Sequence, residues 1–256
     1  MKAAVQSLAE GNGERTVRGA ASDERRASAL DEVGALPRET LGERVEETLR
    51  AFLISGRLAP GEKLSLRNVA ESLSVSMMPV REAVARLASD GALEVLPGRA
   101  VRVPILSVPQ FRELTRIRIA IEGYAAEEAA RNRDDAALCE IERFERAFQE
   151  ATSGDVPEPA LAVEANRDLH FAIYRAAGLP TLTEIVARLW LKAGPILNLD
   201  MRDEPRRLHG GRAVQAHEAL VEAIRRRDGA AARAALAADI ATAADHIVGI
   251  GRLKAS

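Results

Sequence analysis

A chain of 256 residues is long enough for two domains with buried cores, or for one large domain. Aromatic residues make up only 3% of it and alanine is abundant, which favours packed helices over sheets. The formal net charge of −2 gives little support for a nucleic-acid partner. The single cysteine, Cys139, excludes an intramolecular disulfide, and no apolar run reaches the eighteen residues of a membrane helix. We therefore expect a cytoplasmic protein.

Residues 1–37 mix Gly, Ser, Ala, Arg and Glu without any helical or strand period. A basic arm could grip DNA, but this segment carries five basic and six acidic residues. Its composition is typical of a disordered arm that binds nothing.

The segment 38–104 reads as a compact unit of helices and short strands. Glu39–Ser55 has apolar residues at helical spacing and predicts a first helix. Pro60-Gly61 predicts a turn, because proline presets φ at its second position and glycine tolerates positive φ at its third. Ser65 is then expected to cap a short second helix.

A further helix is predicted three residues after the second, starting near Ser76. Its buried stripe is expected to be Val80, Ala83, Val84 and Leu87, and its free face Met78, Arg81, Glu82 and Ala85. Asp90-Gly91 ends this helix. Leu93–Leu96, a turn, and Ala100–Val103 then predict a two-stranded wing. The order of elements indicates a winged helix-turn-helix.

The residues Leu58–Ser65, Pro79–Val84 and Leu87 resemble the DNA-binding half of the GntR family of bacterial transcription regulators. The match runs from about Leu41 to Val103. It implies a double-stranded DNA partner, and contacts from seven residues: Arg67, Ser76, Met77, Met78, Arg81, Gly98 and Arg99. Ser76 is expected mainly to cap its helix, whereas Gly98 and Arg99 would form the tip of the wing.

From residue 105 to 250 the chain reads as an all-helical bundle. Six amphipathic helices are predicted, over 108–131, 134–152, 159–177, 181–198, 212–227 and 229–248. The breaks between them include Gly194-Pro195, together with the region 205–211. The expected fold is mainly α, with an N-terminal winged helix-turn-helix, a small β wing and a C-terminal six-helix bundle. Residues 251–256 form a tail.

Polar residues interrupt the apolar stripes of several bundle helices. Asn166 and His170 share one face, and His217 and Asp239 fall on buried stripes of their own helices. Inward-facing polar groups each need a partner. A metal ion or a bound anion would supply one to all of them.

These positions resemble the helical ligand-binding domain, called FCD, of the FadR-type subfamily of GntR regulators. The resemblance implies a divalent metal (zinc, nickel or manganese) held by Asn166, His170, His217 and Asp239. The subfamily pattern has Asp and His where this chain has Asn166 and Asp239. Arg118 would bind the carboxylate of a small effector, or alternatively form a buried ion pair with Glu122. Tyr174 and Trp190 would line the pocket or pack in the core.

Together the two halves predict a ligand-responsive transcription regulator and not an enzyme. The expected form is a homodimeric repressor that recognises a pseudo-palindromic operator and is released by a small organic acid. Two alternatives are a metal-dependent enzyme built on the bundle, and an architectural DNA-binding protein without an effector.

Met77 departs from the family pattern, in which many members carry arginine at this position. An arginine bidentate to guanine contributes roughly 1–3 kcal/mol of discrimination between bases. Methionine cannot make that contact, so we predict that Met77→Arg shifts operator preference towards sites with guanine at this step. Selection of binding sites from a random duplex library by both proteins measures the shift. Identical preferences would contradict the prediction.

Overall fold

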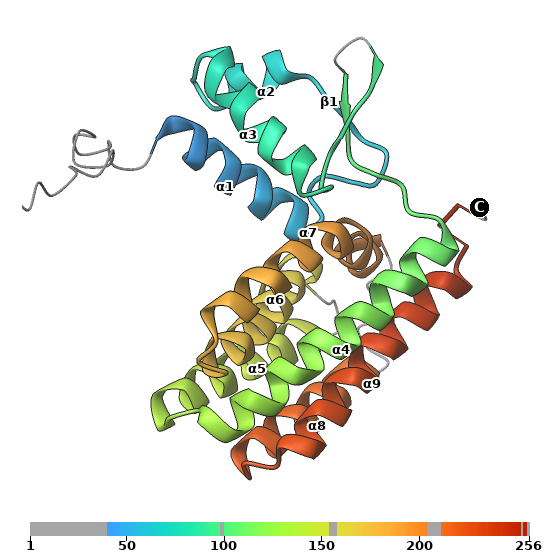
Figure 1. Ribbon diagram of the computed structural model, residues 1–256. Coiled ribbons are helices and arrows are strands. Elements are labelled where there is room, and N and C mark those ends of the chain that lie inside the picture. The colour runs from blue at the N-terminus through green and yellow to red at the C-terminus, as the bar shows by residue number, and fades with distance from the viewer. Residues whose placement is uncertain (1–39, 98–99, 154–157, 204–210, 252, 255–256) are drawn as a thin grey trace, which may run out of the picture. The chain divides into compact units, whose positions relative to one another are not determined.

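The computed structural model describes residues 40–97, 100–153, 158–203, 211–251 and 253–254. Within these residues the chain is mostly helical with one small sheet (Figure 1), which confirms the expected fold class. The predicted arm, the wing tip at Gly98 and Arg99, and the end of the predicted tail lie outside the described residues. Of the described helices, none is long and apolar enough to cross a membrane.

Three helices form the N-terminal half: α1 (Leu41–Ile54), α2 (Leu66–Ser72) and α3 (Met77–Ser89). Thr40 and Glu43 cap the start of α1 reciprocally, each side chain bonding the other residue's backbone N–H. Ser65 caps α2 as predicted, because its hydroxyl accepts from the Asn68 N–H.

The tight turn between α2 and α3 has Ser74 in the left-handed region, at φ 53°. There the Val75 N–H donates to the carbonyl of Ala70 at 3.0 Å.

The sheet has three strands, one more than the sequence predicted. β2 (Glu94–Val95) and β3 (Val101–Arg102) make the wing, and β1 (Lys63–Leu64) pairs with the other edge of β3, giving the order β1-β3-β2 with antiparallel pairs. A two-residue strand has no period to detect, so only its pairing with β3 makes β1 a strand.

The predicted turn lies directly before β1. Gly61 has φ +83°, and the Glu62 N–H donates to the Ala59 carbonyl at 3.0 Å. This turn sets β1 beside β3.

The C-terminal half contains the six predicted helices: α4 (Val108–Asn132), α5 (Asp135–Ser153), α6 (Pro159–Ala176), α7 (Pro180–Asp203), α8 (Arg212–Arg225) and α9 (Gly229–Gly249). Helices α4 and α9 lie side by side in Figure 1. Gly123 and Gly229 allow this approach, because a Cβ on either would lie 3.2 Å or less from atoms of the facing helix.

The predicted break at Gly194-Pro195 is wrong, because α7 continues through Pro195. A proline ring normally clashes with the Cβ of the preceding residue, and Gly194 has none. Gly194 also faces the backbone of α1, where a Cβ would lie 2.8 Å from the Ile54 Cα. Gly194 thus allows both the close packing of α7 against α1 and the presence of a proline directly after it within the helix.

Candidate functional site

The outer face of α3 presents the side chains that the sequence placed there. Met78, Arg81, Glu82 and Ala85 are exposed, and Met78 is 64% exposed. The opposite stripe of α3 is fully buried in the core of the winged half: Val80, Ala83, Val84 and Leu87. The core therefore fixes which side chains of α3 can reach DNA.

The other predicted DNA-contacting residues differ in their surroundings. Arg67 is exposed on α2 and forms an ion pair with Glu71, 2.9 Å away. Met77 is half-buried and packs against the core of the winged half. Ser76 occupies the N-cap of α3. The prediction that its side chain caps this helix is wrong, because the side chain forms no capping hydrogen bond. The exposed Ser76 hydroxyl can therefore take another partner.

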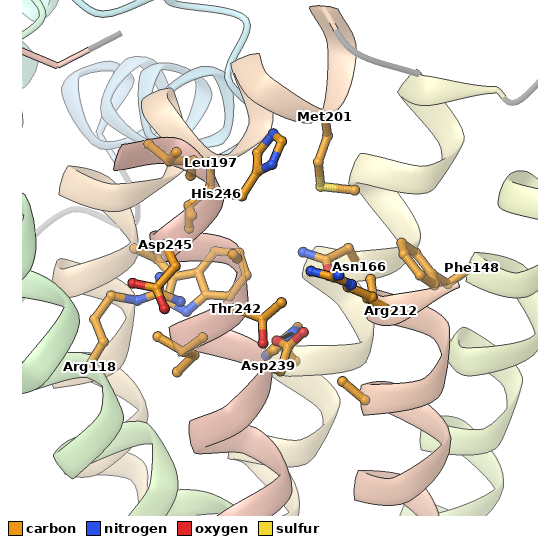
Figure 2. A pocket seen from close by; sticks show the side chains of 17 residues that line it. Arg118, Phe148, Asn166, Leu197, Met201, Arg212, Asp239, Thr242, Asp245 and His246 are labelled. Atoms are coloured by element: carbon orange, nitrogen blue, oxygen red, sulfur yellow. Dashed lines mark ion pairs between the residues drawn. The ribbon is translucent and has the colours of Figure 1, made fainter. Parts of the chain in front are cut away.

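A cavity of about 640 Å³ lies inside the bundle, with walls from all six helices (Figure 2). Its lining includes five of the residues predicted for an effector or metal site: Arg118, Asn166, His170, Trp190 and Asp239. Its apolar walls include side chains from α5, α7 and α9. A cavity of this size holds a small organic molecule.

Three potential metal ligands from three helices meet beside this cavity. One ligand atom each from His170 on α6, His217 on α8 and Asp239 on α9 all lie within 4.8 Å of one another. His170 Nε2 is 3.4 Å from Asp239 Oδ2, and His217 Nε2 is 3.8 Å from Asp239 Oδ1. Both histidine side chains are at least 97% buried, whereas Asp239 is 14% exposed.

Glu122 is a completely buried carboxylate at the centre of a hydrogen-bond network. Arg118 binds it with two N–H groups, Nε at 2.6 Å and Nη2 at 3.1 Å. The Trp190 indole N–H and the Tyr174 hydroxyl both donate to its Oε2. The network connects α4 to α6 and α7. Tyr174 also contacts His170, so the network extends to the cluster of His170, His217 and Asp239.

Tyr174 determines which ring nitrogen of His170 carries the proton. The Tyr174 hydroxyl gives its hydrogen to Glu122, so its oxygen accepts from His170 Nδ1, 3.0 Å away. The hydrogen-bond partners thus assign the proton to Nδ1 and leave the lone pair of Nε2 facing Asp239. Two electron-rich atoms face each other there, an arrangement that a cation between them would relieve.

Burial sets the protonation states around the cluster. It lowers the pKa of His217 from 6.5 to about 4, although the Asp239 carboxylate favours the charged form. Burial alone would raise the pKa of Asp239, but the pKa lies below its usual value, and the nearby guanidinium of Arg118 is one charge that lowers it. Burial also raises the pKa of Tyr174 well above its usual value, which keeps its hydroxyl protonated.

This donor set fits a divalent metal ion. Two neutral imidazoles and one carboxylate are ligands that zinc and other first-row metals accept. Neither ring nitrogen of His217 has a hydrogen-bond partner among the described residues, although both are buried. Buried polar atoms normally have a partner. Asn166 lies one turn before His170 on α6 and borders the same cavity.

Two predicted effector residues have other contacts. Tyr174 is fully buried and is not among the residues that line the cavity; it connects His170 to Glu122 instead. Arg118 borders the cavity, but its guanidinium is held by Glu122 and lies 5.3 Å from the Trp190 ring. The predicted ion pair of Arg118 with Glu122 is therefore confirmed, whereas a contact of Arg118 with an effector stays a prediction.

The sequence reading missed several polar residues of the cavity: Arg212, Thr242, Asp245 and His246. The last three share a face of α9 with Asp239, because their spacings follow the helical period. That spacing was the available signal. No sequence signal pointed to Arg212, because it is one arginine among many. Only its position at the start of α8 places it at the cavity.

Residues 41–103 match the gntR family of bacterial regulatory proteins, and residues 113–242, about half of the chain, match the FCD domain. The chain belongs to the GntR family. As a GntR regulator with an FCD domain it is a DNA-binding transcription regulator, and the FCD domain implies a small-molecule effector. This membership places it with transcription regulators rather than with enzymes.

Named relatives agree with this. The HTH-type transcriptional regulator McbR of Escherichia coli is 36% identical over 166 residues, covering 64% of this chain and 74% of that protein. A probable D-xylose utilization operon repressor of Paenarthrobacter nicotinovorans is 29% identical and covers 80% of this chain and 88% of its own.

Solved structures share the architecture. E. coli McbR superposes with a TM-score of 0.76 at 31% identity, covering 83% of this chain and 99% of its own. A GntR regulator of Rhodococcus sp. RHA1 has a TM-score of 0.66 at 22% identity, and the match covers 81% of this chain and 97% of that one. At this identity the likeness supports only the fold.

The low pKa of His217 predicts a loss of stability in acid. Between pH 6.5 and about 4 the unfolded chain protonates His217 and the folded chain does not, so stability falls as the pH falls through this window. Between pH 6.5 and 4.5 the loss is about 2 kcal/mol, since each pKa unit corresponds to about 1.4 kcal/mol. Urea unfolding of EDTA-treated protein at pH 6.5 and 4.5 measures it. His217→Gln should lose less stability over this interval, and equal losses would contradict the prediction.

Proposed function

We propose that this regulator is a repressor that leaves its operator when a small organic acid binds in the bundle. Residues 38–104 would bind DNA, and residues 105–250 would bind the effector and form the homodimer. The observation that carries the proposal is the cavity between the bundle helices with its His170, His217 and Asp239 cluster, in a chain that also presents the free outer face of α3.

On the DNA side, the exposed face of α3 would enter the major groove. Arg81 has no ion pair among the described residues, so its guanidinium is available for a guanine edge or a phosphate. Met78 supplies apolar contact beside it. Arg67 would reach a phosphate from α2, Met77 would support the start of α3, and Ser76 would contact a phosphate there. Gly98 and Arg99 would contact DNA from the wing.

Two such reading helices in a symmetric dimer would lie about 34 Å apart, one turn of the duplex. The operator would therefore be a pseudo-palindrome. An acid that binds one arrangement of the bundle more tightly shifts the dimer population towards that arrangement. Release of DNA follows if the favoured arrangement no longer matches the half-site spacing.

A divalent ion would be held by His170, His217 and Asp239, with Asn166 as a fourth ligand. When bound, the ion supplies positive charge for an acid's carboxylate. The chain prepares the site by itself: Tyr174 holds the proton on His170 Nδ1, and burial keeps His217 neutral. Arg118 and Trp190 would form the wall next to this centre.

Arg81 provides the test of DNA binding. We expect Arg81→Ala to weaken binding to the operator roughly tenfold or more, because a base contact of arginine contributes about 1–3 kcal/mol. Binding to the DNA upstream of the gene and to a scrambled duplex, across a salt series, measures the effect. Arg116→Ala is the matched control, since Arg116 is an exposed arginine of α4 in the bundle. An equal loss in both variants, or equal binding to both duplexes, would contradict the proposal.

Calorimetry with Zn²⁺, Ni²⁺ and Mn²⁺ on EDTA-treated protein tests the metal centre. We expect stoichiometric binding that Asp239→Ala abolishes. Tyr174→Phe should lower affinity roughly 10–100-fold, because it removes the partner that orients His170. Asp245→Ala removes a carboxylate of the same cavity outside the cluster and should bind metal like the wild type. Equal affinity of the Asp239→Ala variant would refute the site.

A further inference from the structure

Among the described residues that line the cavity, four have charged side chains and their surroundings differ: Arg118, Arg212, Asp239 and Asp245. Arg118 is neutralised by the bidentate contact with Glu122, and Asp239 belongs to the histidine cluster. The side chain of Arg212, which is exposed at the start of α8, makes no ion pair or hydrogen bond in the part of the chain that the structure describes. The guanidinium of Arg212 is thus the cation of the cavity wall that is not already compensated by a carboxylate.

Position separates the two arginines as well. Arg118 comes from the middle of α4 and Arg212 from the first residue of α8, and Figure 2 draws them on opposite sides of the cavity. Asp245 is drawn on the side of Arg118. A carboxylate beside Asp245 would be repelled, whereas beside Arg212 it would gain charge-assisted hydrogen bonds.

The remaining wall is mainly apolar. Its large side chains come from α5, α7 and α9: Phe148, Trp190, Leu197, Met201, Ile240 and Ile247. An acid of two or three carbons would leave most of the 640 Å³ without contact to this surface. An acid with an apolar body would bury surface against it and gain affinity.

We infer that the effector is a monocarboxylic acid with an apolar body of medium length, and that Arg212, not Arg118, binds its carboxylate. This rests on the proposed function, since it specifies the ligand of that regulator's cavity. Arg212 is then a specificity-determining residue, which selects acids over neutral molecules of the same shape. Arg118 is a positioning residue that acts through Glu122.

The sole tryptophan, Trp190, borders the cavity, so its fluorescence reports binding directly. Titrations would use octanoate, octanamide and acetate with EDTA-treated full-length protein, so that no metal ion supplies charge to the carboxylate. We expect octanoate to bind at least tenfold tighter than octanamide, because only the acid makes a charge-assisted contact. Acetate should bind much more weakly than octanoate, because it covers little of the apolar wall.

Variants assign the selectivity to one arginine. Arg212→Gln should reduce the preference for octanoate over octanamide to roughly twofold or less, and Arg212→Lys should restore part of it. Arg226→Gln, at the other end of α8 and outside the cavity lining, should keep the full preference.

Three results would overturn the inference: no binding of octanoate by the wild type, equal binding of octanoate and acetate, or an acid preference that survives in Arg212→Gln. Operator binding by the wild type without any acid tests the proposed function separately. A wild type that binds its operator but fails these titrations would refute only the ligand class.

Discussion

The arrangement of the bundle depends on the burial of the Glu122 carboxylate. A buried charge is costly unless opposite charge and hydrogen bonds compensate it. Arg118 supplies the charge, and Tyr174 and Trp190 supply the further donors. Because these four residues come from α4, α6 and α7, satisfying one carboxylate fixes the relative register of three helices. A one-turn shift of α6 or α7 would remove the Tyr174 or the Trp190 donor from Glu122, and only Arg118, on the same helix as Glu122, would stay in place.

The chemistry of the cavity follows from this constraint. Tyr174 has to donate to Glu122, so it can only accept from His170, and the lone pair of His170 Nε2 is directed to Asp239. His217 arrives from α8 with no hydrogen-bond partner among the described residues for either ring nitrogen. The structural network thus ends at the candidate metal centre, and the two share His170. Arg118 serves the network, which leaves anion binding to a residue outside it.

Helix α7 connects the cavity to the winged half. Trp190 borders the cavity, while its neighbour Leu191 belongs to the buried core of the winged half. One turn further, Gly194 lies against the backbone of Ile54, and the Asn198 side chain donates to the Ile54 carbonyl. A movement of α7 caused by a ligand would therefore act on the C-terminal end of α1 without any intervening element.

The sequence by itself determined the fold class, the six bundle helices and the two faces of α3, because these follow from local periodicity and turn residues. It also named His170, His217 and Asp239, whose polarity breaks an apolar stripe. Tertiary structure alone decided the rest. β1 exists because β3 lies beside it, and α7 continues through Pro195 because Gly194 packs against α1. Arg118 and Tyr174, expected to contact an effector, donate to Glu122 instead. Arg212, which the sequence did not single out, lines the cavity. Such pairings join residues up to 140 positions apart, as Gly194 and Ile54 are, a separation at which no local pattern carries information.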